Sequence, residues 1–130
     1  MSELRGRADD LDTKVATAHY SKGNYSEALR RADAILLASP HVALSWRFKG
    51  ECLFELVRYA EAIACFDKAV ELGGPGTEEL FIWKALALHG SGASEEAKTL
   101  LTQYVTDARK HPPQLVLKAQ GVLTELQNAS

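Results

Sequence analysis

The chain has 130 residues, of which 46% are hydrophobic and 25% charged, and its formal net charge is -2. This size is enough for one globular domain and too small for two ordinary ones. A general nucleic-acid binder needs a basic surface that displaces counterions from phosphates, so the slightly acidic balance argues against that class. No apolar run reaches the roughly 18 residues of a membrane span. Because the polar N-terminus also lacks the apolar core of a secretory signal, we expect a cytoplasmic protein.

A series of helices is predicted along the chain, separated by turns that contain glycine or proline. The first eight residues are polar and predict a frayed N-terminal lead. In the segment near residues 43–56, the residues Trp46, Gly50, Leu53 and Val57 recur at the spacing of one helical face. Alternation with a period of two never persists, so no strands are predicted. The turns are expected at Gly23, Pro40, 73–76, 90–92 and 112–113.

Three segments within these elements resemble one another closely. Each carries an alanine at the same place, and these three alanines are spaced by 34 and then 35 residues. Such a period predicts a protein built from stacked supersecondary units. The segments are residues 23–29, 57–63 and 92–98, with Ala28, Ala62 and Ala97 as the matching alanines.

The period and pattern resemble the tetratricopeptide repeat, a helix–turn–helix unit of roughly 34 residues. The middle repeat matches best, with Trp46, Gly50, Tyr59, Ala62 and Phe66 at the family's positions. The resemblance covers about residues 9–112. It implies an all-α fold, a right-handed α-α superhelix of three helix–turn–helix repeats with a seventh, capping helix. The departures from the family's pattern are Lys49 and Lys84 in a usual leucine place, and Asp12 in place of an aromatic residue.

Domain boundaries follow from this register. We expect a lead at 1–8, repeats at 9–42, 43–76 and 77–112, and a capping helix at 113–130. The last segment carries Leu115, Ala119, Val122 and Leu126 along one stripe. Because the end of a solenoid exposes an apolar face, we expect this helix to cover it. Dimerisation is the alternative role for this helix.

The first helix of each repeat carries a second stripe beside the one that packs on its pair mate. The resemblance implies that these positions line a concave surface and contact a ligand. The groove is then polar at its N-terminal end and aromatic toward its C-terminal end, with Trp83 a binding residue more than a core residue. The alternative is that the large apolar residues of this stripe are buried between repeats. The predicted partner-binding residues are Lys14, Thr17, Tyr20, Leu44, Arg47, Phe48, Glu51, Phe54, Glu55, Glu79, Ile82, Trp83, Leu86 and His89.

One subclass of these repeats binds a C-terminal carboxylate with a clamp of Lys, Asn and Arg side chains. At the matching places this chain has no cation and no asparagine, so the resemblance does not extend to that function. The residues at those places are Thr13, Thr17, Phe48, Glu79 and Trp83.

No catalytic, cofactor or metal site is predicted. The four histidines, at positions 19, 41, 89 and 111, occur singly and without metal-ligand spacing. Cys52 and Cys65 lie in helical patterns without a Cys-x-x-Cys motif, and we expect free, buried thiols in a reducing compartment.

We therefore expect a non-enzymatic module that binds a protein or peptide, as a monomer or weak homo-oligomer. The alternatives are a self-assembling structural scaffold and a small chaperone for a hydrophobic client. Type III secretion chaperones are small three-repeat proteins of the latter kind. This chain is expected to differ from them in being shorter and in lacking a long helical N-terminal extension.

Overall fold

A computed structural model describes the backbone of residues 2–129 and the side chains of residues 11–129. Within this part of the chain all regular structure is helical and no strand occurs, as the sequence predicts. The helices are α1 (Ser2–Ser21), α2 (Tyr25–Ala38), α3 (Ala43–Glu55), α4 (Tyr59–Leu72), α5 (Leu80–Gly90), α6 (Ser94–Thr106), the short 3-10 helix η1 (Ala108–Lys110) and α7 (Pro113–Asn128). None of the described helices is long and apolar enough to cross a bilayer.

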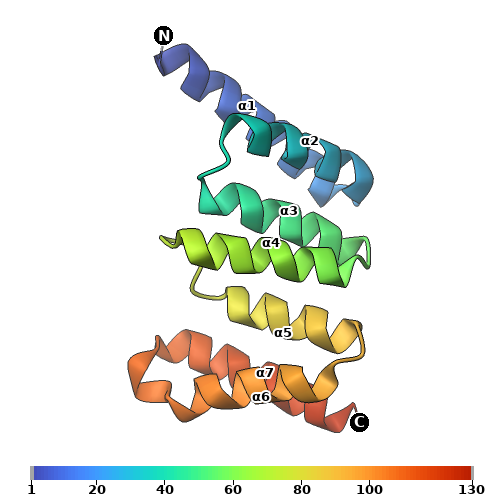
Figure 1. Ribbon diagram of the computed structural model, residues 1–130, viewed down its shortest axis with the longest axis vertical. Coiled ribbons are helices and arrows are strands. Elements are labelled where there is room, and N and C mark those ends of the chain that lie inside the picture. The colour runs from blue at the N-terminus through green and yellow to red at the C-terminus, as the bar shows by residue number, and fades with distance from the viewer. Residues whose placement is uncertain (1, 130) are drawn as a thin grey trace.

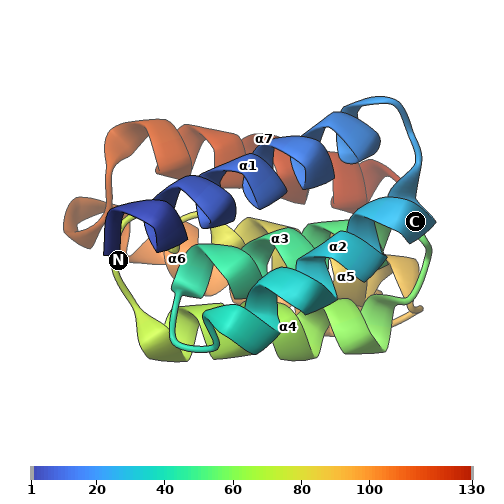
Figure 2. The ribbon, with the colours of Figure 1, turned by 90° about the horizontal axis from the view of Figure 1, so that it is seen from above.

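The helices form three consecutive hairpins that stack one on another, and α7 packs on the last of them (Figure 1). Seen from the end of the stack, α1 and α7 lie on one side of the molecule and α4 on the opposite side, with α3 and α5 between (Figure 2). The stack is therefore bowed. Its concave surface is lined by α1, α3, α5 and α7. The all-α solenoid with a seventh, capping helix is confirmed.

A small residue recurs where neighbouring helices approach most closely. Ala16, Ala85 and Ala119 are fully buried, and Gly50 occupies the matching place in α3. A Cβ atom on Gly50 would lie 2.5 Å from the ring of Phe66. Because Ala119 continues the register of the three repeats, α7 packs as a further first helix, with no pair mate within residues 2–129.

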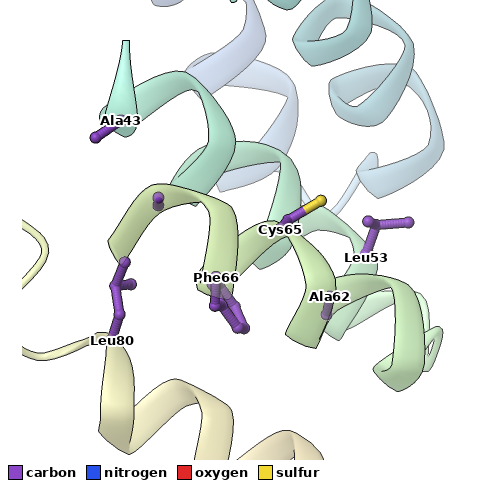
Figure 3. Close-up of a cluster of buried hydrophobic side chains, with 7 residues drawn as sticks. Ala43, Leu53, Ala62, Cys65, Phe66 and Leu80 are labelled. Carbon is purple, nitrogen blue, oxygen red and sulfur yellow. The ribbon is translucent and has the colours of Figure 1, made fainter. Parts of the chain in front are cut away.

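The core consists of two apolar clusters along the stack. One joins α3, α4 and the start of α5, with Leu53, Phe66 and Leu80 each at most 1% exposed (Figure 3). The other joins α5, α6 and α7. Cys52 and Cys65 are buried and free, as expected, and burial raises the pKa of the Cys52 thiol to about 12. These thiols are held in their unreactive protonated form.

The two lysines that depart from the family's pattern form inter-repeat ion pairs. Lys49 of α3 lies 2.9 Å from Asp33 of α2, and Lys84 of α5 lies 2.9 Å from Asp67 of α4. The same contact therefore joins the first repeat to the second and the second to the third. Lysine in the leucine place adds a contact between repeats instead of disturbing the register.

The turn within each hairpin requires a left-handed residue. Glycine fills it in the first and third hairpins, with φ 80° at Gly23 and 97° at Gly92. The second hairpin has Val57 there, with φ 63° and a side chain that is 67% exposed. A β-branched residue in this region is strained, because its Cβ crowds the backbone.

The N-terminal lead differs from the prediction. Residues 2–8 belong to α1, which spans 20 residues, whereas residue 1 lies outside the described residues. Glu3, Leu4 and Arg5 are good helix formers, so the helix continues toward the N-terminus beyond the hairpin.

Candidate functional site

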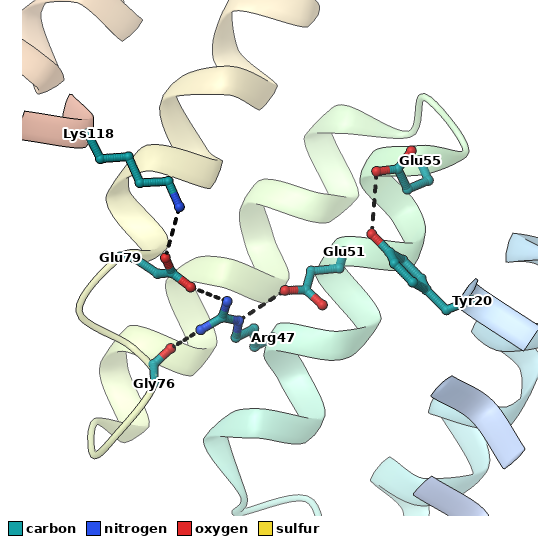
Figure 4. A network of polar contacts seen from close by, with 7 residues as sticks. All are labelled: Tyr20, Arg47, Glu51, Glu55, Gly76, Glu79 and Lys118. Atoms are coloured by element: carbon teal, nitrogen blue, oxygen red, sulfur yellow. Dashed lines mark hydrogen bonds and ion pairs between the residues drawn. The ribbon is translucent and has the colours of Figure 1, made fainter. Parts of the chain in front are cut away.

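The concave surface carries a network of polar contacts centred on Arg47 of α3 (Figure 4). Arg47 Nε donates to Glu51 Oε1 at 3.0 Å, Nη1 donates to the carbonyl of Gly76 at 2.6 Å, and Nη2 donates to the Glu79 carboxylate. Lys118 Nζ of α7 donates to the second Glu79 oxygen at 3.3 Å. The network thus joins α3, the α4–α5 loop up to the N-cap of α5, and α7 on the concave surface.

Helical spacing aligns the residues on the α3 side. Arg47, Glu51 and Glu55 are four residues apart and therefore share one face of the helix. Tyr20, near the end of α1, donates its hydroxyl to Glu55 at 3.4 Å, and its ring lies 5.8 Å from that of Phe48. Tyr20 and Glu55 therefore carry the polar surface from α3 across to α1.

The acidic residues of this surface differ in how well they are compensated. Burial raises the pKa of Glu51 by more than its hydrogen bond from Arg47 lowers it, and the charges of Glu79 and Glu55 raise it further. Burial also raises the pKa of Glu79, but its bonds from Arg47 and Lys118 lower that pKa overall. The ionised form is thus favoured at Glu79 and disfavoured at Glu51. Burial and the neighbouring carboxylates also raise the pKa of Tyr20, so its hydroxyl stays protonated and donates.

An apolar cavity of about 210 Å³ lies between α1, α2 and α3. We call it the Phe48 cavity, since the Phe48 ring lines it and also contacts Tyr20. Leu44 lines it as well and is 55% exposed, so an apolar surface is open to solvent there. The cavity is lined by Thr13, Ala32, Ile35, Val42, Leu44, Ser45 and Phe48.

The predicted aromatic end of the groove is largely inter-helix packing. Trp83 is half-buried, packs on the core cluster and meets Phe54 edge to face at 5.4 Å, with the Phe66 ring at 6.0 Å. Ile82 is 3% exposed because α7 covers it, with Ala119 in the same cluster. Ile82 therefore has too little open surface for the predicted contact. Trp83 and Phe54 pack against the core cluster but are only partly buried, and a binding role for both stays a prediction.

The remaining predicted residues lie at the ends of the surface. Lys14 and Thr17 are exposed on α1, and the Thr17 hydroxyl donates to the Thr13 carbonyl of its own helix. Leu86 is half-buried against the second core cluster. His89 is half-buried and shares a hydrogen bond of 2.9 Å with the Ser94 hydroxyl. Neither Leu86 nor His89 touches the network around Arg47.

Sequence reasoning did not place Lys118 and Gly76 in the site. Lys118 lies 34 residues after Lys84, and the register alone would have paired it with the preceding helix, as Lys49 and Lys84 are, instead of with Glu79. The role of Gly76 is a backbone carbonyl in a loop, for which no sequence pattern exists. Among the described residues, no three His, Cys, Asp or Glu side chains gather in a way that could hold a metal ion.

Known proteins share both the repeat sequence and the fold of this chain. Residues 14–77 match the family described as "Tetratricopeptide repeat". No curated protein sequence matches the chain.

Three solved structures share the architecture. The type III secretion translocator chaperone SycD of Yersinia enterocolitica has a TM-score of 0.79 at 17% identity, covering 95% of this chain and 93% of that one. A type III secretion system complex from Aeromonas hydrophila has a TM-score of 0.78 at 17% identity, with coverage of 95% and 83%. The N-terminal domain of stress-induced protein-1 from C. elegans has a TM-score of 0.70 at 20% identity, with coverage of 93% and 95%. At these identities the likeness is one of fold. The chain is expected to be shorter than type III secretion chaperones, but this chain and the solved SycD chain each cover nearly all of the other.

Proposed function

We propose that this chain, whose residues 14–77 match the tetratricopeptide repeat family, is a protein-interaction module that binds a peptide or partner segment on its concave surface. The observation that carries this proposal is the pairing of an open apolar feature with a polar rim. Leu44 is exposed beside the Phe48 cavity, and the network around Arg47 borders it. Exposed apolar surface rimmed by polar groups is typical of protein-binding sites.

The fixed network favours a preformed groove. Arg47 reaches Gly76 and Glu79, and Lys118 reaches Glu79, so α3, the loop that leads into α5, and α7 are linked to one another. A preformed surface loses less conformational entropy on binding than a flexible one. The proposed units are the repeats at 9–42, 43–76 and 77–112, with 113–130 as the cap that completes the groove.

A small chaperone for a hydrophobic client is the second candidate. One solved structure of similar fold is described as a translocator chaperone, and the open Phe48 cavity suits an apolar side chain. A self-assembling scaffold remains the alternative from a different class. Solution mass over a range of concentrations separates the scaffold from the other two candidates, since a scaffold keeps growing with concentration whereas an adaptor or chaperone stops at a small, fixed number of copies.

Site-directed photo-crosslinking tests the concave surface directly. A photoreactive amino acid at position 44 is compared with one at position 37, because Leu37 is also an exposed leucine, 87% open, but lies on α2 outside the groove. We expect discrete adducts from position 44 and none from position 37 in cytosol of the source cells. Equal adduct patterns from both positions would contradict a binding site on the concave surface.

A further inference from the structure

We propose that the segment bound on the concave surface carries a lysine or arginine that pairs with Glu51 and Glu55, beside an apolar side chain that enters the Phe48 cavity. This inference rests on the proposed function and specifies its partner. The partner is a peptide in which a basic residue stands close to an aliphatic or aromatic one.

Unbalanced charge is the first argument. The network of Figure 4 holds three carboxylates, Glu51, Glu55 and Glu79, against two cations. Arg47 is shared between Glu51 and Glu79, and Lys118 pairs with Glu79, so both cations lie toward Glu79. Within residues 11–129 no lysine or arginine lies within ion-pair distance of Glu55, which is exposed.

The burial of Glu51 also favours binding of a further cation. Its side chain is only 17% exposed, and burial leaves its ionised form disfavoured despite Arg47. A second cation placed between Glu51 and Glu55 would favour that ionised form, since an opposite charge within about 4–6 Å stabilises a carboxylate. Glu55 has no lysine or arginine of residues 11–129 at ion-pair distance, so the Tyr20 end of the surface stays acidic.

Aromatic rings border these carboxylates. The rings of Tyr20 and Phe48 lie 5.8 Å apart, and the Tyr20 hydroxyl already donates to Glu55. Cations are attracted to aromatic faces within about 6 Å of the ring centre, and a guanidinium group can also stack on them. Two carboxylates beside two rings thus form a site that suits arginine better than lysine.

The spacing on α3 sets the spacing in the ligand. Glu51 follows Phe48 by three residues and Glu55 follows it by seven, which is roughly 5–10 Å along a helix. An extended peptide covers about 3.3 Å per residue, so the basic and apolar residues should stand two or three positions apart.

Selection from a displayed library of random 12-residue peptides tests the inference on the full chain. We expect enriched peptides to carry Arg or Lys two or three positions from Leu, Ile or Phe. The best peptide, synthesised with a fluorophore, is then measured by anisotropy against variants. Glu51→Gln combined with Glu55→Gln should lower the affinity for this peptide about tenfold, as loss of close charge pairs does at interfaces. The matched control Glu95→Gln, at a carboxylate that is 91% exposed on α6, should leave affinity within about twofold.

The apolar contact has its own matched pair. Leu44→Asp should also lower the affinity for the peptide about tenfold or more, whereas Leu37→Asp should leave it unchanged, although both leucines are exposed. The inference would be overturned if the enriched peptides carried no basic residue and if Leu44→Asp, but not the double glutamine variant, lowered their affinity. The proposed function would still stand in that case. Selection of no peptide sensitive to either change would overturn both. If sedimentation shows a dimer that Leu44→Asp dissociates, a second copy occupies the surface and the inference is wrong.

Discussion

The same substitution, glycine to alanine, should have opposite effects in two helices of this protein. Alanine in a helix interior is favoured over glycine by about 0.5–1 kcal/mol, because glycine loses more backbone freedom on folding. Gly121 lies inside α7, and an added Cβ there meets nothing within 4 Å. Gly121→Ala should therefore raise the free energy of unfolding by about 0.5–1 kcal/mol.

Gly50 meets a different environment. An added Cβ would lie 2.5 and 2.7 Å from two carbons of the Phe66 ring, well inside contact distance. Phe66 is fully buried in the cluster between α3, α4 and α5, so its ring has no open space to enter. Overpacking of this kind costs typically 1–3 kcal/mol, which exceeds the propensity gain. We expect Gly50→Ala to lower the free energy of unfolding by about 1–2 kcal/mol.

Urea denaturation followed by circular dichroism measures both variants, with the slope of the free energy against urea concentration checked for constancy. Phe66→Leu serves as a second background, since removing ring atoms makes room for the new methyl group. Gly50→Ala should cost less there than in the wild type, and the difference is the coupling between the two residues. Equal stabilisation by Gly50→Ala and Gly121→Ala would refute the close approach of α3 to α4 described here.

Four further predictions test other parts of the structure. Val57→Gly should stabilise the protein by about 1 kcal/mol in thermal melts, because relief of left-handed strain outweighs the entropy that glycine adds to the unfolded chain; an unchanged or lower melting temperature would contradict the strain. Glu79→Gln should lower the free energy of unfolding at pH 7, and this difference from the wild type should vanish as pH falls through the lowered pKa of Glu79. Glu51→Gln should change the free energy of unfolding little at pH 7, because the pKa of Glu51 is raised in the folded state and the stability it contributes is lost as pH rises. Equal losses in the two glutamine variants across pH 3–8 would rule this out. Trp83→Ala should destabilise by on the order of 2–3 kcal/mol, below the range for a fully buried ring; a mutant that melts like wild type but loses its partner would restore the binding role. Deleting residues 113–130 should expose Ile82 and Leu101 and cause aggregation in light scattering; a soluble, equally stable truncation would show that α7 is not a cap.

The concave site was only partly predictable, and α5 shows why. Its sequence is apolar on nearly every side, with a hydrophobic residue at each position from 80 to 88 except Lys84. A helical wheel therefore cannot tell which of these residues a neighbouring helix covers. The structure buries Ile82 in the cluster that joins α5 to α7 and packs Trp83 on Phe54, while a binding role for Trp83 and Phe54 stays a prediction. On α3, by contrast, Arg47, Glu51 and Glu55 interrupt the apolar pattern, and their placement on one face followed from spacing alone.

The repeat by itself determined the helices, the turns between them and the all-α solenoid. A period of 34 or 35 residues fixes helix length and turn position locally, and each unit must stack on the next to bury its apolar face. Only the tertiary structure decided which charges meet. Arg47 and Glu79 are 32 residues apart and Glu79 and Lys118 are 39 apart, so no local pattern links them. Their contact depends on the curvature of the stack, which arises from small rotations between repeats that the period does not specify.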